Sequence, residues 1–187
     1  ISTSCPVFGS LFLHVNHHAV FFYQREVFLI NHLVQFAKEG LDKGEPLLFV
    51  TTTDHRIVLQ RRLLNESVLA PFKGVYLAMD ATDTLSRIMV DDWPDQDLFM
   101  KEIGDMIRLI AQGTRIRIYG EMVSVLWARG QCNAAIQLEK LWNKLATQYE
   151  FALLCAYRSS DFEGPEKVSL RRDVCACHSD VVSAPGL

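Results

Sequence analysis

The sequence has no long apolar run and no excess of basic residues, and each absence excludes a class of protein. No apolar stretch approaches the ~18 residues of a membrane-spanning helix, so we predict no membrane partner. The 19 Lys and Arg residues are outnumbered by 22 Asp and Glu residues, which gives a formal net charge of -3. Because nucleic acid is bound mainly through its phosphates, this balance argues against nucleic acid as a direct partner.

Motifs for phosphate binding and nucleophilic catalysis are also missing. The chain contains no G-x-x-x-x-G-K-[ST] loop, no G-x-G-x-x-G after a predicted strand and no G-x-S-x-G nucleophile elbow. We therefore expect neither enzymatic activity nor a cofactor. A nucleophile–base couple of Cys155 and His178 is the remaining catalytic alternative, although single Cys and His residues match such a pattern easily by chance.

The composition that remains is typical of one globular domain. The chain has 187 residues, of which 49% are apolar, enough for a sizeable core. Ile1 to Leu13 carries no basic region and no small-residue cleavage site, so we expect no signal peptide. The 5 cysteines are an odd count and Cys155 lies in an apolar run, which favours free thiols in a reducing cytoplasm. We predict an N-terminal extension at 1–14, a single domain at 15–182 and a tail at 183–187.

Short apolar runs alternate with amphipathic segments along the chain. The predicted strands are 19–23, 47–51, 75–79, 115–119 and 151–156. The predicted helices are 27–41, 55–65, 81–89, 94–111, 122–128, 132–149 and 169–182. Asp54 is predicted to cap the second helix, and Pro94 to begin the fourth. This alternation predicts an α/β fold in three layers, with a mainly parallel sheet and helices on both faces.

The segment 132–149 has the clearest helical periodicity. Its apolar residues recur on one face, at Ala135, Leu138, Leu141, Trp142 and Leu145. We predict that Leu138 and Trp142 are buried. The charged residues Glu139, Lys140 and Lys144 are expected to lie largely off that face.

Polar side chains follow several of the predicted strands, where ligands bind in open parallel sheets. They are Tyr23, Asp54, Asp80, Glu121, Cys155 and Tyr157. For Asp54 and Asp80 we favour a helix-capping role. Glu121 stands between a strand and an apolar run. We favour a ligand-orienting role for it, beside His18, His178 or Tyr157 and partly unpaired, over a structural role as an acceptor of backbone hydrogen bonds.

The segment from Cys175 to His178 resembles a fragment of a metal site. Its spacing is unlike the usual structural zinc motifs, in which two residues separate the cysteines. We therefore assign no metal, and keep Cys175, Cys177 and His178 as an alternative site to which His17 or His18 would add a ligand. The other explanation is a helix with one buried thiol and a hydrogen-bonded His178.

Several segments together resemble the MEDS domain, named for methanogen, methylotroph and dichloromethane-regulator sensory proteins. They are His18 to Tyr23 (HAVFFY), Gly40 to Glu45 (GLDKGE), Tyr119 to Trp127 (YGEMVSVLW), Leu138 to Asn143 (LEKLWN), Leu154 to Tyr157 (LCAY) and Cys177 to Ser179. Their order and spacing carry the resemblance. It implies a domain that senses a small molecule, one-carbon or hydrocarbon-like, and signals to a histidine kinase, anti-sigma or transcription-regulator module.

The pattern F-x-x-x-G-L-x-x-G-E-x-x-L-x-V, which begins at Phe36, is also similar to the RecA/KaiC-type ATPase core. In that core a phosphate loop precedes the matching helix. Here Gln24, Arg25 and Glu26 stand in its place, without its glycines or its lysine. The resemblance therefore implies a degenerate P-loop scaffold that does not hydrolyse nucleotides.

The leading hypothesis is a non-enzymatic, cytoplasmic sensory input domain of a prokaryotic signalling system. Its ligand-binding residues are predicted to be His18, Tyr23, Glu121, Trp127, Cys155, Tyr157 and His178. Three alternatives stay open. They are a metal- or redox-responsive module built on Cys155, Cys175, Cys177 and His178, an interaction scaffold without a ligand, and a nucleotide binder without hydrolysis. The sequence is also compatible with a homodimer.

Overall fold

Six parallel strands form the central sheet, in the order β3-β2-β6-β7-β1-β8. The computed structural model describes residues 17–66 and 76–184. The strands are β1 (His17–Tyr23), β2 (Leu47–Thr51), β3 (Tyr76–Asp80), β6 (Ile116–Gly120), β7 (Phe151–Arg158) and β8 (Asp180–Ser183). β4 (Met89–Val90) and β5 (Trp93–Pro94) pair separately as a short antiparallel hairpin. The predicted parallel α/β fold is confirmed.

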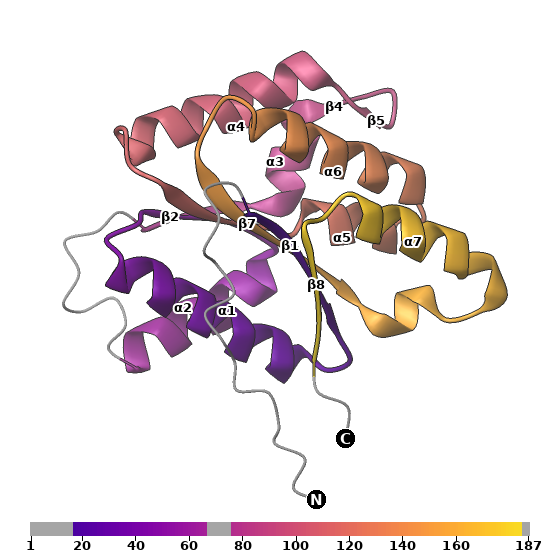
Figure 1. The fold of residues 1–187 in the computed structure, drawn as a ribbon, viewed down its shortest axis with the longest axis horizontal. Helices are drawn as coiled ribbons and strands as arrows, with labels where there is room; N and C mark the ends of the chain where they lie inside the picture. The colour runs from indigo at the N-terminus through magenta and orange to yellow at the C-terminus, as the bar shows by residue number, and fades with distance from the viewer. Residues whose placement is uncertain (1–16, 67–75, 185–187) are drawn as a thin grey trace, which may run out of the picture.

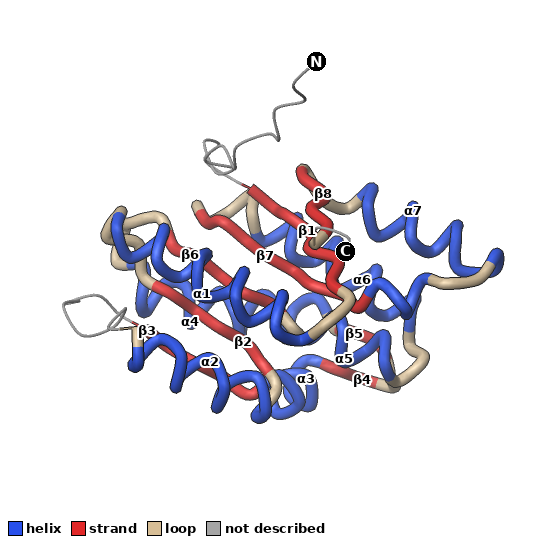
Figure 2. The backbone as a smooth tube through the Cα atoms, turned by 90° about the horizontal axis from the view of Figure 1, so that it is seen from below, coloured by secondary structure: helices blue, strands red, loops and turns tan. Residues whose placement is uncertain are grey.

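Helices cover both faces of the sheet (Figures 1 and 2). On one face lie α1 (Glu26–Asp42) and α2 (Thr53–Asn65). On the other lie α3 (Ala81–Ile88), α4 (Gln96–Ala111), α5 (Met122–Ala128), α6 (Cys132–Leu145) and α7 (Val168–Ala176). Two short 3-10 turns, Ser159–Phe162 and Pro165–Lys167, connect β7 to α7. The three-layer architecture is therefore as predicted, whereas the relation to P-loop ATPases stays a prediction.

The side chains of the four middle strands, β1, β2, β6 and β7, alternate between two separate apolar cores. Along β1, Val20 and Phe22 pack under α3 to α7, whereas Ala19, Phe21 and Tyr23 pack under α1 and α2. Successive side chains of a strand point to opposite faces, so neighbours in the sequence belong to different layers. All seven residues of β1 are buried, as expected for a parallel strand covered on both sides.

The last predicted helix, 169–182, is wrong in its second half. α7 ends at Ala176, and the chain then forms the edge strand β8, which pairs with β1. Ser179 fixes this change of direction, since its backbone N–H donates to the carbonyl of His18 at 2.8 Å. The β-branched Val181 and Val182 then suit a strand better than a helix. β8 also carries the sheet to Ser183, one residue into the predicted tail.

Helix starts differ from the predictions in two places. α2 begins at Thr53 with Thr52 at its N-cap, so Asp54 lies in the first turn instead of capping. α4 is capped by Asp95, whose side chain accepts from the N–H of Leu98, and Pro94 belongs to β5. By contrast, Asp80 caps α3 as predicted and accepts two backbone N–H groups.

The remaining sequence predictions divide between described and undescribed residues. Among the described residues, no helix is both long and apolar enough to cross a membrane. Four of the cysteines, Cys132, Cys155, Cys175 and Cys177, have free thiols. The predicted extension at 1–14 and most of the predicted tail, 185–187, lie outside the described residues.

Candidate functional site

A pocket of about 330 Å³ opens at the carboxyl ends of the four middle strands. Tyr23 ends β1, Thr52 follows β2, Glu121 follows β6 and Arg158 ends β7, and all four line the pocket. The chain leaves β1 and β2 toward the α1–α2 layer but leaves β6 and β7 toward the opposite layer. Ligands in open α/β folds bind at such reversals, because the diverging connections leave a crevice. We call this cavity the strand-end pocket.

Acidic side chains predominate in the strand-end pocket. Two basic residues, His55 and Arg158, face four carboxyl groups, those of Glu26, Asp54, Glu121 and Asp161. The full lining is Tyr23, Glu26, Thr52, Asp54, His55, Glu121, Ser124, Val125, Ala128, Arg158 and Asp161. This balance disfavours an anionic ligand.

A continuous polar chain crosses the pocket and ties four elements together. Arg158 of β7 forms an ion pair with Glu26 of α1. A second Glu26 oxygen, Oε2, lies 2.5 Å from Nε2 of His55, and Nδ1 of His55 lies 2.5 Å from Oε1 of Glu121. Glu121 in turn accepts the backbone N–H of Thr52 at 2.7 Å. Polar contacts therefore join β7, α1, α2 and the turn after β6.

The environment of Glu121 differs from the one we favoured from the sequence. Its carboxylate is 4% exposed and accepts bonds from the backbone and hydroxyl of Thr52 as well as contacting His55. It is therefore fully paired, as in the structural alternative. The prediction that Glu121 lies beside His18, His178 or Tyr157 was wrong, because these three residues lie around Glu139 instead. The reason is the turn after Gly120, which places Glu121 over the first turn of α2.

Burial and charge set the protonation of the pocket. Burial opposes the protonated form of His55, but Glu121 and then Glu26 outweigh it and raise the pKa of His55 above its ordinary value of 6.5. For the acidic groups burial acts in the other direction, and it raises the pKa of the Tyr23 hydroxyl and that of the Asp161 carboxyl. The position of His55 between two carboxylates therefore favours its protonated form.

The raised pKa of His55 predicts that the domain loses stability as the pH rises. A histidine whose pKa is higher in the folded state contributes stability that is complete below its unfolded pKa, near 6.5, and is lost as the pH rises through the folded pKa. The free energy of unfolding in urea should therefore fall as the pH rises above about 6.5, and the fall should be smaller in His55→Gln.

The matched control for this experiment is His32→Gln. Burial lowers the pKa of His32, so the titration of His32 affects stability only at pH values below its ordinary pKa of 6.5. The fall above that pH should therefore persist in His32→Gln. Equal falls in His55→Gln and the unmodified chain would contradict a charged His55.

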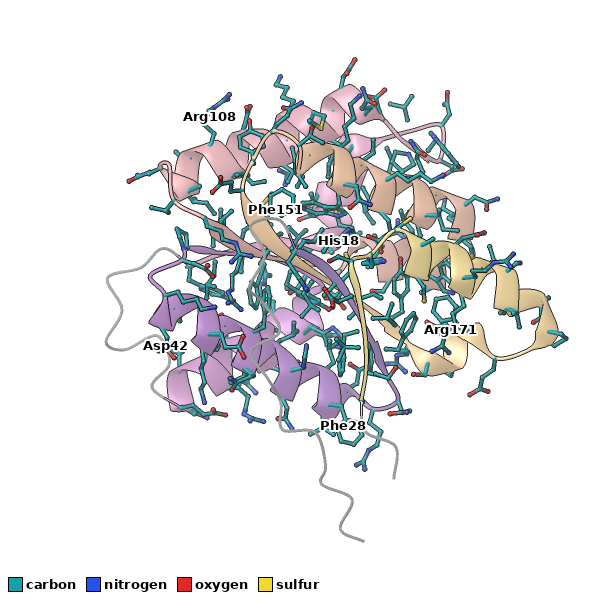
Figure 3. The ribbon with its side chains drawn as sticks, in the orientation of Figure 1. His18, Phe28, Asp42, Arg108, Phe151 and Arg171 are labelled. Atoms are coloured by element: carbon teal, nitrogen blue, oxygen red, sulfur yellow. The ribbon has the colours of Figure 1, made fainter. Side chains whose placement is uncertain are left out.

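Four other predicted residues meet in the interior, between the sheet and the helices α6 and α7. His18 lies near the start of β1, where Figure 3 labels it. Cys155 and Tyr157 lie in β7, and His178 follows α7. They surround Glu139 of α6, whose side chain is completely buried. Its Oε2 lies 3.2 Å from both Nε2 of His18 and Sγ of Cys155. We call His18, Glu139, Cys155 and His178 the interior cluster.

The interior cluster strongly perturbs the acidity of its members. Burial alone would raise the pKa of Glu139, but His178 and His18 outweigh it and hold that pKa well below its usual range. Burial, and then the Glu139 charge, raise the pKa of the Cys155 thiol far above its usual value. The same two causes raise the pKa of Tyr157, whose hydroxyl donates to Oε1 of Glu139 at 2.8 Å. A nucleophilic cysteine needs the opposite shift.

The structure thus divides the seven predicted ligand residues. Tyr23 and Glu121 line the strand-end pocket, whereas His18, Cys155, Tyr157 and His178 lie in or against the interior cluster. Trp127 joins neither group, since its ring packs edge-on against Tyr157 and beside Phe162. The alternation of strand side chains explains the division, because Tyr23 and Cys155 face opposite layers. Of the residues in the metal alternatives, His18, Cys155 and His178 belong to the interior cluster, whereas Cys175 and Cys177 do not.

Sequence reasoning missed His55, Glu26 and Glu139. Glu26 and His55 follow the ends of β1 and β2 closely, so their distance from a strand end was a usable signal. Glu139 lies four residues after Ala135 and three before Trp142, a spacing that places it on the buried face of α6. The prediction that Glu139 lies largely off that face was therefore wrong.

Two comparisons with known proteins bear on this arrangement. No curated protein matches the chain significantly. The family model for the methanogen/methylotroph, DcmR sensory domain matches residues 17–179, which cover nearly the whole of the described fold and contain both the strand-end pocket and the interior cluster. The chain therefore belongs to the MEDS family of sensory domains.

Proposed function

We propose that this sensory domain binds a small organic molecule in the strand-end pocket and has no enzymatic activity of its own. The observation that carries the proposal is the pocket's position, where the connections diverge and one polar chain links four elements. Its volume of about 330 Å³ is near the lower end of the range for small-molecule sites. The high pKa of the buried Cys155 thiol supports the non-enzymatic part of the proposal.

The ligand is neutral or cationic. Glu26 is the first residue of α1, directly after the turn that follows β1, and this is the region where P-loop proteins place the backbone and lysine that hold phosphates. Its carboxylate, with those of Asp54 and Asp161, repels an anion, while Tyr23 and Val125 supply apolar surface. This chemistry suits organic ammonium ions and small alcohols better than nucleotides. The same chemistry is compatible with the one-carbon or hydrocarbon-like compounds that the family resemblance implies.

Signal output would run through α2. The first turn of α2 holds His55 against the pocket, and its outer face exposes Ile57, Val58 and Leu64. A ligand that replaces the contacts of His55 shifts the equilibrium between two positions of this helix, by as much as its affinity for the two differs. A cytoplasmic kinase, anti-sigma or regulator module that docks on α2 would detect the shift.

Thermal unfolding with a panel of small compounds tests the proposal. The panel contains methylammonium, trimethylammonium and methanol against inorganic phosphate and ATP. A compound at about 100 times its Kd should raise Tm by roughly 5–10 °C, and only the neutral or cationic compounds should do so.

Two tryptophan variants locate the effect. Ala128→Trp fills the pocket from an exposed position and should abolish the shift. The matched Val58→Trp, on the outer face of α2, should keep it. A shift that survives in Ala128→Trp, or one seen with ATP alone, would refute a neutral or cationic ligand in this pocket.

A further inference from the structure

The interior cluster places four metal-ligating atoms around one point. The ligand atoms of His18, Glu139, Cys155 and His178 all lie within 4.8 Å of one another. Sγ of Cys155 is 3.5 Å from Nε2 of His18, and Nε2 of His178 is 3.4 Å from Oε1 of Glu139. An ion with tetrahedral bonds of about 2.0–2.3 Å keeps its ligand atoms about 3.3–3.7 Å apart. Four of the separations, at 3.2–3.5 Å, are close to the edges of such a tetrahedron, with Glu139 contributing Oε2 to two of them and Oε1 to one.

The hydrogen bonds of the two histidines leave the same nitrogen of each ring turned inward. Nδ1 of His18 lies 2.9 Å from the side-chain oxygen of Asn143, and Nδ1 of His178 lies 2.7 Å from the carbonyl of Val174. Both partners are acceptors, because the Asn143 amide nitrogen donates to the carbonyl of Cys177. Each Nδ1 therefore donates a proton to its partner, and Nε2 of each ring is the nitrogen that faces the centre. This arrangement is typical of metal-binding histidines.

Without a bound metal ion, Nε2 of His18 and Nε2 of His178 face only the oxygens of Glu139 and the sulfur of Cys155. Nε2 of His178 belongs to a fully buried side chain and makes no hydrogen bond, although a Glu139 oxygen lies 3.4 Å away. The two imidazole rings are 4.0 Å apart between centroids, so placing a positive charge on both is unfavourable. A divalent ion with one carboxylate and one thiolate has no net charge, which reduces the cost of burying the group.

We propose that His18, Glu139, Cys155 and His178 form a binding site for a divalent transition-metal ion, with Zn²⁺ best suited to the donors. Two imidazoles, a thiolate and a carboxylate match the borderline softness of Zn²⁺. Four protein ligands close the coordination sphere, as in structural rather than catalytic sites. Tyr157, which donates to the carboxylate, and Asn143 are positioning residues.

The ion would join the last part of the chain to the centre of the sheet. Its ligands come from β1, α6, β7 and the connection between α7 and β8. A cavity of about 730 Å³ between α6 and α7 lies beside the site, and its lining includes Asn143, which contacts His18, and Cys177, which precedes His178. The site is independent of the strand-end pocket, so failure of either proposal leaves the other standing.

Titration of the full chain, without a histidine tag, with Zn²⁺ or Co²⁺ tests the site. Elemental analysis should find one bound ion per chain after excess metal is removed. Bound Co²⁺ should show the intense visible bands of a tetrahedral complex and a near-ultraviolet charge-transfer band from a single thiolate. A wild-type chain that binds less than one equivalent, or that binds Co²⁺ without the thiolate band, overturns the proposal.

Cysteine variants assign the ligands. Cys155→Ser should abolish the charge-transfer band, whereas Cys175→Ser and Cys177→Ser, which change the nearby thiols, should retain it. Asn143→Ala should weaken Zn²⁺ binding about 10–100-fold while the stoichiometry stays at one. A band that persists in Cys155→Ser, or that disappears in Cys177→Ser, places the metal elsewhere. If Cys155→Ser does not fold by circular dichroism, loss of one-to-one binding in His178→Gln decides the matter.

Discussion

Arg117→Met is expected to destabilise the domain by about 3–5 kcal/mol, because it leaves a buried carboxylate without its main partner. Arg117 is completely buried in β6 beneath α1. Its Nε donates to Glu45 at 2.6 Å, and its Nη1 donates to the carbonyl of Phe36 at 3.2 Å. Gly40 of α1 makes room for it, since a Cβ there would lie 2.5 Å from Cδ of Arg117.

A double-mutant cycle in urea measures this effect and separates it from lost packing. Glu45→Met alone should also be destabilising, because it leaves the buried guanidinium without its closest carboxylate. The double variant should recover much of the loss, since replacing a whole buried pair with apolar residues is often nearly neutral. Strictly additive losses would show that the two residues do not depend on each other.

Trp142→Ala should cost about 3–5 kcal/mol, through the cavity that it leaves in the larger core. The Trp142 ring is fully buried and packs edge-on against Phe99 of α4, with 5.0 Å between ring centroids. It also covers the backbone of Gly120, where an added Cβ would lie 3.3 Å from the ring.

Trp142→Phe is the matched control for the aromatic contact. The indole N–H of Trp142 makes no hydrogen bond, so phenylalanine removes an unsatisfied donor while keeping an aromatic ring. We expect this variant to lose clearly less stability than Trp142→Ala. Denaturant midpoints for the three chains provide the comparison, and an unchanged midpoint in Trp142→Ala would show that the ring does not support the core.

The order of strands and helices could be predicted because apolar runs and helical periodicity are local features. Leu138 and Trp142 are buried as the periodicity of α6 predicted. β8 could not be predicted in this way, since four residues carry little periodicity and their pairing with β1 depends on Ser179 contacting His18. The burial of Arg117 could not be predicted for a similar reason. Polar and apolar residues alternate along β6, which suggests a strand with one face in solvent, but α1 covers that face.

The candidate site could be predicted only in part, because its residues come from distant positions and opposite faces. The edge of the sheet and the position of Glu121 at that edge followed from the topology. Which polar residues share a layer depends on strand register. A shift of one residue exchanges the layers, as Tyr23 and Tyr157 show, since Tyr157 is in register with Phe22 and faces the other layer from Tyr23. Glu139 was missed because a charged residue is expected on the surface, whereas burial among histidines reverses that expectation.

The position of β1 has a consequence for how the chain is made. β1 is the first strand of the sheet, yet its neighbours are β7 and β8, the last two. Thus His18 meets Cys155 137 positions later and Ser179 161 positions later. During synthesis this apolar segment emerges long before either partner exists, and its contacts require the closure of very large loops. β1 can therefore complete its pairing only after β7 and β8 have been synthesised.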